Sequence, residues 1–93
     1  MNIFESLKSY AGKWNVTNSR NFTQDEINAV SSAVVVYSEY GNSVCFHMVS
    51  GGMTFIPLSN NSTKGIGESV DLNQCKLLTL SKQGEADINR IEC

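Results

Sequence analysis

Charge is scarce in this 93-residue sequence: only 17% of its residues are Asp, Glu, Lys or Arg, and the formal net charge is −2. Neither half of the chain carries a basic surplus. Strong binding to duplex nucleic acid requires many contacts between Lys or Arg side chains and phosphates. The composition therefore argues against that class, although it remains compatible with a local basic groove.

We also expect no membrane-spanning or targeting segment. No stretch approaches the roughly 18 to 20 apolar residues of a transmembrane helix. No apolar run follows a basic start, so we expect no signal peptide. The three cysteines, Cys45, Cys75 and Cys93, are odd in number and have no CxxC spacing. These features predict reduced thiols in a cytoplasm and no membrane partner.

Catalytic and metal-binding patterns are missing too. His47 is the only histidine, and Cys45, two residues away on the same predicted strand, is poorly placed as its activated nucleophile. A zinc site made of these two with Cys75 and Cys93 would lack the close ligand pairs of structural zinc sites, and Cys93 is expected to fray. The loop at 59–68 lacks the GxxxxGK[ST] order of a phosphate loop. We expect no enzyme, no catalytic residue, no metal and no cofactor.

What the sequence does contain is a pattern of three β-strands joined by glycine turns. The strands are predicted at AVVVYSEY (33–40), SVCFHMVS (43–50) and MTFIPLS (53–59), with links at 41–42 and 51–52. Two-residue links that contain glycine suit type I′ or II′ hairpin turns. They predict an antiparallel meander in which Tyr37 faces Phe46, Val36 faces His47, and Met48 faces Phe55.

This register gives the meander two apolar faces. One face gathers Val35, Tyr37, Val44, Phe46, Met48, Met53 and Phe55. The other gathers Val34, Val36, Cys45, His47, Val49, Ile56 and Leu58. A half-solvated sheet has one polar face, so something must cover each side here. We expect the N-terminal helices to cover the aromatic face and the β-branched face to line a barrel, with buried Val34, Val36, Val49, Ile56, Leu58, Leu78 and Leu80.

A first short helix is predicted near the N-terminus. Asn2 can cap it, its apolar stripe is Ile3, Phe4, Leu7 and Ala11, and Gly12 stands where a helix-ending glycine belongs. Residues 13–21 are expected to form a polar connector after it.

A second helix is predicted by its capping residues. Thr23 and Glu26 have the spacing of a capping box, while Phe22 and Ile27 have that of a hydrophobic staple. This helix is expected to run to about Val30, where the β-branched residues take over.

Two more strands are predicted at CKLLTLS (75–81) and ADINRIE (86–92), and a weaker one at ESVDL (68–72). Helices precede strands rather than alternating with them, which argues against a parallel sheet. The sequence thus predicts one domain, 1–93, of α+β class. Two short N-terminal helices occupy 1–32, and 33–92 form an antiparallel five- or six-stranded small barrel, OB-like or SH3-like.

Four segments of the β-rich part, residues 33–92, have a recognisable pattern: SVCFHMVSGG, TFIPLS, GIGESVDL and LLTLSKQGEADINRI. In these segments the chain resembles small uncharacterised proteins carried by phages and mobile elements of gut Bacteroidales-type bacteria. The GESVDL segment followed by a strand is also similar to strand openings of OB-like barrels. The resemblance implies a phage-type accessory role in the cytoplasm of a bacterial host and no functional residues.

Aromatic and basic side chains provide the one candidate binding surface. Small barrels that hold single strands combine aromatic platforms with a few basic groups. The candidate residues are Trp14, Lys13, Arg20, Tyr37, Phe46 and Phe55. Alternatively, helix residues bury the same rings. We expect a non-enzymatic binding protein, a homo-oligomer more than a monomer, with single-stranded DNA or RNA as partner. The alternative is a self-associating structural protein or one that binds and inhibits a host protein.

Overall fold

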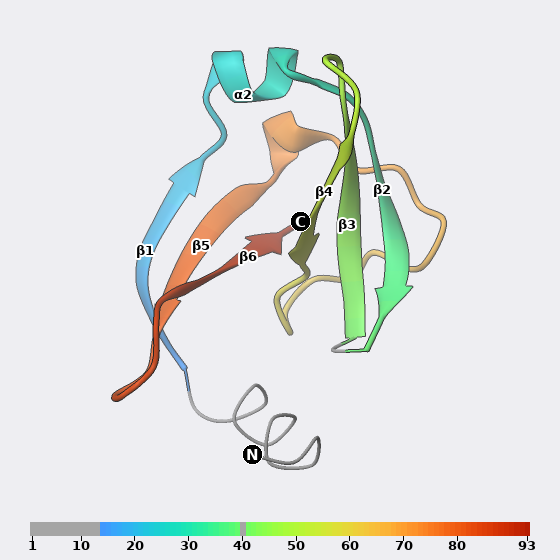
Figure 1. Ribbon diagram of the computed structural model, residues 1–93. Helices are drawn as coiled ribbons and strands as arrows, with labels where there is room; N and C mark the ends of the chain where they lie inside the picture. The colour runs from blue at the N-terminus through green and yellow to red at the C-terminus, as the bar shows by residue number, and fades with distance from the viewer. Residues whose placement is uncertain (1–13, 40) are drawn as a thin grey trace.

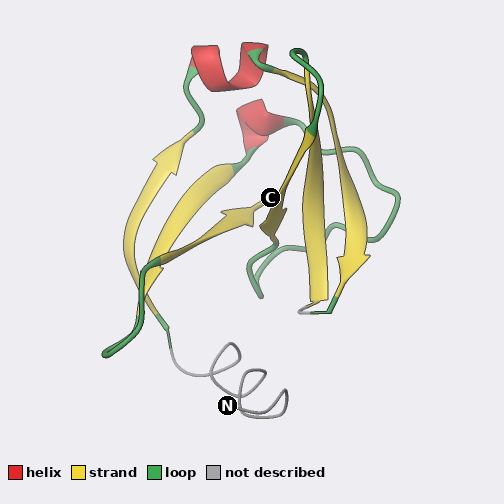
Figure 2. Ribbon diagram, viewed as in Figure 1, coloured by secondary structure: helices red, strands yellow, loops and turns green. Residues whose placement is uncertain are grey.

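The computed structural model describes residues 14–39 and 41–93 as two three-stranded antiparallel sheets (Figure 1, Figure 2). One sheet has the order β1-β5-β6, made of β1 (Asn15–Asn21), β5 (Lys76–Ser81) and β6 (Ile88–Glu92). The other has the order β2-β3-β4, made of β2 (Val30–Ser38), β3 (Gly41–Met48) and β4 (Met53–Pro57). A short helix, α2 (Gln24–Asn28), and a 3-10 turn, η1 (Leu72–Gln74), complete the regular elements of this part.

The predicted class, α+β with an OB-like or SH3-like barrel, is wrong. The sheets stay separate, and β4 approaches β6 through a bridge between Leu58 and Ile91, so the described residues close no barrel. The helix capped by Asn2 lies outside the described residues. Most of the predicted connector, 13–21, is instead strand β1. All its side chains are exposed, so it lacks the apolar alternation that would have identified a strand.

The predicted capping box of α2 is confirmed. Thr23 Oγ1 accepts from the Glu26 N–H at 3.2 Å, and the Glu26 carboxylate accepts from the Thr23 N–H at 2.9 Å. Phe22 and Ile27 both pack against the buried cluster. The helix ends at Asn28, two residues before the predicted end, because Val30 already belongs to β2. No helix in the described part of the chain is long and apolar enough to cross a membrane.

The first hairpin closes earlier than predicted. Ser38 pairs with Gly41, so that glycine, with a φ of 105°, begins β3 instead of forming the loop. Tyr37 therefore faces Asn42 rather than Phe46, a shift of four residues. Because side chains alternate with a period of two, an even shift leaves every side chain of these strands on its predicted face.

The second hairpin also differs, and its difference changes the faces. The loop spans 49–52, and Phe55 pairs with Cys45 instead of Met48. This shift of three residues is odd, so the side chains of β4 move to the opposite face from the predicted one. Phe55 consequently lies on the other side of the sheet from Phe46.

The core lies between the two sheets and is sealed by the segment around η1. Its buried members are Ala33, Val35, Val44, Phe46, Leu58, Val70, Leu72, Cys75 and Ile91. Val35, Val44 and Ile91 are at most 1% exposed. The sheet face that was expected to carry the helices is therefore the one that faces the opposite sheet.

The predicted core residues divide accordingly. Leu58, Leu78 and Leu80 are buried as predicted, at 6%, 6% and 9% exposure, and Ile56 packs against the core from a partly buried position. Val49 is 64% exposed at the hairpin loop. Val34 and Val36 point away from the core on the opposite face of β2. For these last three residues the prediction is wrong.

The weak strand predicted at 68–72 is a single bridge, Val34 with Ser69. The segment still pairs with the edge of β2, because Val35 N–H donates to Glu68 O at 3.0 Å and Gly67 N–H donates to Val35 O at 2.8 Å. Val70 N–H donates to Ala33 O at 2.9 Å. These bonds occupy backbone groups through which another chain would otherwise extend this edge.

Candidate functional site

Among the described residues, the side of sheet β2-β3-β4 that faces away from the core differs from an ordinary solvated sheet face. The observed register places ten side chains on this outer face: Ser32, Val34, Val36, Ser38, Ser43, Cys45, His47, Met53, Phe55 and Pro57. None of them is Asp, Glu, Lys or Arg. A solvated face of an antiparallel sheet normally carries polar side chains, so the outer face has the composition of a surface that is covered.

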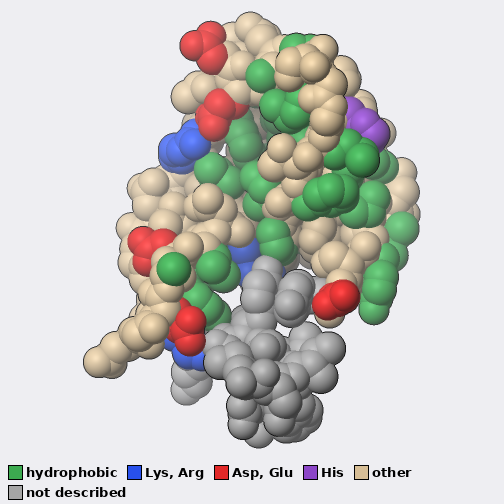
Figure 3. Space-filling model, in the orientation of Figure 1, with side chains coloured by type: hydrophobic (Ala, Val, Ile, Leu, Met, Phe, Trp, Pro, Cys, Tyr) green, Lys and Arg blue, Asp and Glu red, His purple; other side chains and the backbone are tan. Residues whose placement is uncertain are grey.

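Solvent nevertheless reaches the outer face. Met53 is 58% exposed and Phe55 is 56% exposed, while Val34 and Val36 are partly exposed. Cys45, at the centre, is buried at 4% between its neighbours on β2 and β4. Hydrophobic atoms gather over the side of the molecule where β2 and β3 lie (Figure 3). Contiguous exposed apolar patches of this kind mark interaction sites.

The structure does not bring the predicted aromatic residues to one surface. Phe46 is 3% exposed and packs against Phe22, with ring centroids 6.4 Å apart. Phe55 lies on the outer face, beyond the sheet from Phe46. Tyr37 is 74% exposed near the end of β2, on the side that Phe46 occupies. Phe46 is buried as the alternative expected, but in the core between the sheets, whereas Tyr37 and Phe55, which the alternative also expected to be covered by helix residues, are exposed.

The predicted basic and indole groups lie apart from these rings. Trp14 is partly buried, and Lys82 Nζ lies 5.9 Å from the centroid of its ring. Arg20 is bound to Glu26 through two contacts, of 2.7 Å and 3.0 Å. Lys13 lies outside the described residues. Nucleic-acid binding by these residues therefore stays a prediction, without a shared platform that would carry it.

The Arg20–Glu26 pair is a salt bridge between two partly exposed side chains. Hydrogen bonds from the Arg20 guanidinium and then from the Thr23 N–H lower the pKa of Glu26 from 4.5 to about 2. The carboxylate thus stays ionised down to strongly acidic pH, and its charge is largely compensated by its partner.

The cysteines lie in two separate places. Cys45 belongs to the outer face, whereas Cys75 packs in the core and Cys93 packs against it. Burial raises the pKa of the Cys75 thiol to about 12 and also raises that of Cys93. Among residues 14–39 and 41–93, no three His, Cys, Asp or Glu side chains gather closely enough to hold a metal ion.

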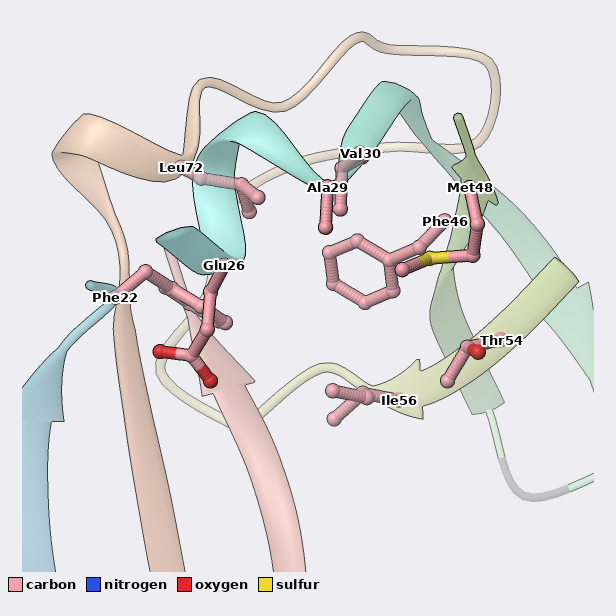
Figure 4. A pocket seen from close by; sticks show the side chains of 9 residues that line it. All are labelled: Phe22, Glu26, Ala29, Val30, Phe46, Met48, Thr54, Ile56 and Leu72. Carbon is pink, nitrogen blue, oxygen red and sulfur yellow. The ribbon is translucent and has the colours of Figure 1, made fainter. Parts of the chain in front are cut away.

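A second feature is a pocket of about 230 Å³ at the end of the molecule that carries α2. Its walls are Phe22, Glu26, Ala29, Val30, Phe46, Met48, Thr54, Ile56 and Leu72 (Figure 4). The Phe46 ring and the Met48 thioether project into the space between α2 and β4 (Figure 4). All walls except Glu26 and Thr54 are apolar, and the pocket opens to solvent on one side.

Sequence reasoning identified Phe55 but not its neighbours on the outer face. Met53 was assigned to the face of Phe46, and Val34 and Val36 were assigned to the core. The signal that could have corrected the face of Met53 is the hairpin length, since a four-residue loop at 49–52 places Phe55 opposite Cys45 and Met53 opposite His47. No sequence pattern predicted the pocket, because it depends on how α2 packs over β3 and β4.

Comparison with known proteins adds no relative: no family model matches the chain, and no curated protein and no solved structure shows significant similarity to it.

Proposed function

We propose that this chain is a non-enzymatic binding protein that associates with a second copy of itself through the outer face. The supporting observation is a mostly apolar sheet face without Asp, Glu, Lys or Arg, on which Met53 and Phe55 are more than half exposed. A phage-type accessory role in a bacterial cytoplasm, which the resemblance implies, belongs to the same proposal.

Charge decides which partner fits the outer face best. A nucleic acid needs Lys or Arg beside its phosphates, and the ten positions of the face supply neither. A second copy needs only an apolar surface that is compatible with itself. In a two-fold interface each residue meets the same patch on the partner, so a face without charges brings no like charges together.

The geometry also favours packing of the outer face over pairing at the edge of β2. The edge of β2 is occupied by the segment 67–70, which blocks extension of the sheet on that side. Two sheets can instead pack face to face about 10 Å apart with interdigitating side chains. Phe55 and Met53 are the projecting side chains that would enter the partner's face.

The size of the face predicts a weak dimer. Three strands about 4.8 Å apart and about seven residues long give roughly 300 Å² per copy. A standard interface buries about 800 Å² per partner. We therefore expect a dissociation constant of the dimer on the order of tens to hundreds of micromolar. The dimer will then be populated only at high protein concentration.

Sedimentation equilibrium from 5 to 500 µM, a range that brackets that rough affinity, tests the proposal. The wild type should move from the 10.2 kDa monomer mass toward twice that value as concentration rises. Phe55→Lys should remain monomeric, because the dimer would bury an unpaired ammonium group. The matched control is Tyr37→Lys, which adds the same charge at an exposed aromatic residue that is not on the outer face, and it should dimerise like the wild type.

The same proteins test the alternative partner, single-stranded nucleic acid. A labelled oligonucleotide at low salt should not bind to the wild type. The Phe55→Lys variant adds a positive charge that would attract phosphates, so it is included in the same titration. A monomer at every concentration, or equal loss of association in both variants, would overturn the proposal. Salt-sensitive oligonucleotide binding by a monomeric wild type would overturn it in favour of the nucleic-acid function.

A further inference from the structure

We propose that the pocket beside α2 binds a neutral planar molecule of one or two fused rings that carries a single N–H or O–H donor. The pocket lies at the end of the core, and its walls are not part of the outer face, so this inference is independent of self-association. Three properties of the walls define the ligand: their volume, their charge and the placement of their polar atoms.

Volume sets the number of rings. A cavity of about 150 Å³ lined by aliphatic and aromatic side chains can hold benzene. The pocket here measures about 230 Å³, which is room for a second fused ring. The tilted rings of Phe22 and Phe46, 46° apart, offer edges and faces to a planar guest. The Met48 thioether adds a polarisable contact of the kind that sulfur makes with aromatic rings.

Charge excludes ionic ligands. Glu26 is the only charged wall residue, and its carboxylate lies 2.7 Å from the Arg20 guanidinium. A cationic ligand would approach Arg20 as well as Glu26, and an anionic ligand would meet Glu26 itself. The two charges compensate each other, so the pocket favours a molecule without net charge.

The polar atoms of the pocket wall determine which hydrogen-bonding group the ligand needs. Glu26 Oε1 accepts hydrogen bonds from Arg20 and from the Thr23 N–H, whereas Oε2 accepts one from Arg20 at 3.0 Å. A carboxylate oxygen can accept two bonds, so Oε2 keeps one acceptor position. The carboxylate stands beside Phe22 at the border of the pocket, across from Thr54 (Figure 4). A donor on the ring system can therefore bind the carboxylate while the rings enter the apolar interior.

Methyl NMR with indole as the probe tests the site. Titration of the isotopically labelled chain should give saturable shifts at the methyls of Val30, Met48, Ile56 and Leu72, while the methyls of Met53 and Val36 on the outer face stay unchanged. The matched ligand is 1-methylindole, which keeps the rings but lacks the donor. It should bind about two- to tenfold more weakly, although its extra methyl group makes it the more hydrophobic ligand.

Variants of equal bulk locate the binding. Ala29→Phe should fill the pocket and weaken indole binding at least tenfold. Val49→Phe adds a phenyl group at a 64% exposed loop position and should bind as the wild type does. If Ala29→Phe does not fold, the shift map of the wild type decides alone. The inference fails if the pocket methyls show no saturable shift up to the solubility limit of indole, or if outer-face methyls shift most. It also fails if 1-methylindole binds as tightly as indole, or if a folded Ala29→Phe binds indole as well as Val49→Phe does.

Discussion

Val35 and Val36 are neighbours on β2 that point to opposite sides of the sheet, and they provide the sharpest test of which face is inside. Val35 is 1% exposed in the core, whereas Val36 lies partly exposed on the outer face. The same substitution to alanine can be made at both positions. Its effect on strand propensity is then nearly equal, and the difference between the two variants reports burial alone.

The magnitude follows from what each substitution removes. Val35→Ala deletes two methyl groups from a closed site, which costs about 1.6 kcal/mol in transfer free energy. A cavity that collapses only in part raises the loss to about 2 to 3 kcal/mol. Val36→Ala leaves no enclosed cavity, so we expect a loss of about 1 kcal/mol or less.

Urea denaturation followed by far-ultraviolet circular dichroism gives the two free energies of unfolding. The protein should be kept at a few micromolar, below the expected range of self-association, because a dimer would add concentration-dependent stability. Equal slopes against urea would show that both variants unfold to comparable states. A Val36→Ala variant that loses as much stability as Val35→Ala would refute the assignment of the inner face.

Two further predictions concern ionisable groups. Glu26→Gln keeps a residue suited to the capping box but loses the Arg20 salt bridge, so at pH 7 it should be less stable by about 1 kcal/mol, a figure reduced for the exposure of the pair. The folded-state pKa of Glu26 is lowered to about 2, so this advantage should be complete above pH 4.5 and disappear as the pH falls toward 2. An equal difference in unfolding free energy at pH 2 and pH 7 would contradict it. The pKa of Cys75, raised to about 12 by burial, should keep that thiol unreactive toward dithionitrobenzoate at pH 8, and Cys93 should react slowly for the same reason. Rapid colour release by all three thiols of the native protein would show that these sites are open.

Local chemistry in the sequence predicted local structure well. The capping box of Thr23 and Glu26 forms as expected, because its partners are three residues apart and need no tertiary contact. The strands around Leu78 and Ile91 are present for a similar reason: alternation and turn residues define them.

Pairing between segments was predicted less well because it depends on loop geometry. Two glycines at 51–52 are compatible with a two-residue turn, but the chain uses a four-residue loop in which both glycines have positive φ. The resulting odd shift reversed the face of Phe55 and with it the candidate site. Even so, the prediction that both faces of the meander need a cover holds for the inner face, which packs against the opposite sheet. The same prediction makes the outer face a candidate interaction surface.

Strand β1 could not be predicted from its own residues. Its seven side chains are exposed, and it is a strand only because β5 offers it hydrogen bonds. A polar edge strand carries no apolar signature, so only the partner reveals it. The barrel prediction is wrong for the same reason. Because β1 was not predicted as a strand, a separate sheet of β1, β5 and β6 was not predicted either.

The two sheets differ in how far along the chain their partners lie, and this sets an order of assembly. Sheet β2-β3-β4 is a meander whose neighbours follow one another directly, whereas β1 pairs Asn15 with Ser81. Local hairpins form quickly, while distant pairing must first close a long loop. During synthesis the meander can fold once the chain has emerged from the ribosome as far as Pro57. Strand β1 is polar and stays unpaired until β5 has emerged as well. The solvated side chains of β1 suit a segment that spends this interval in water.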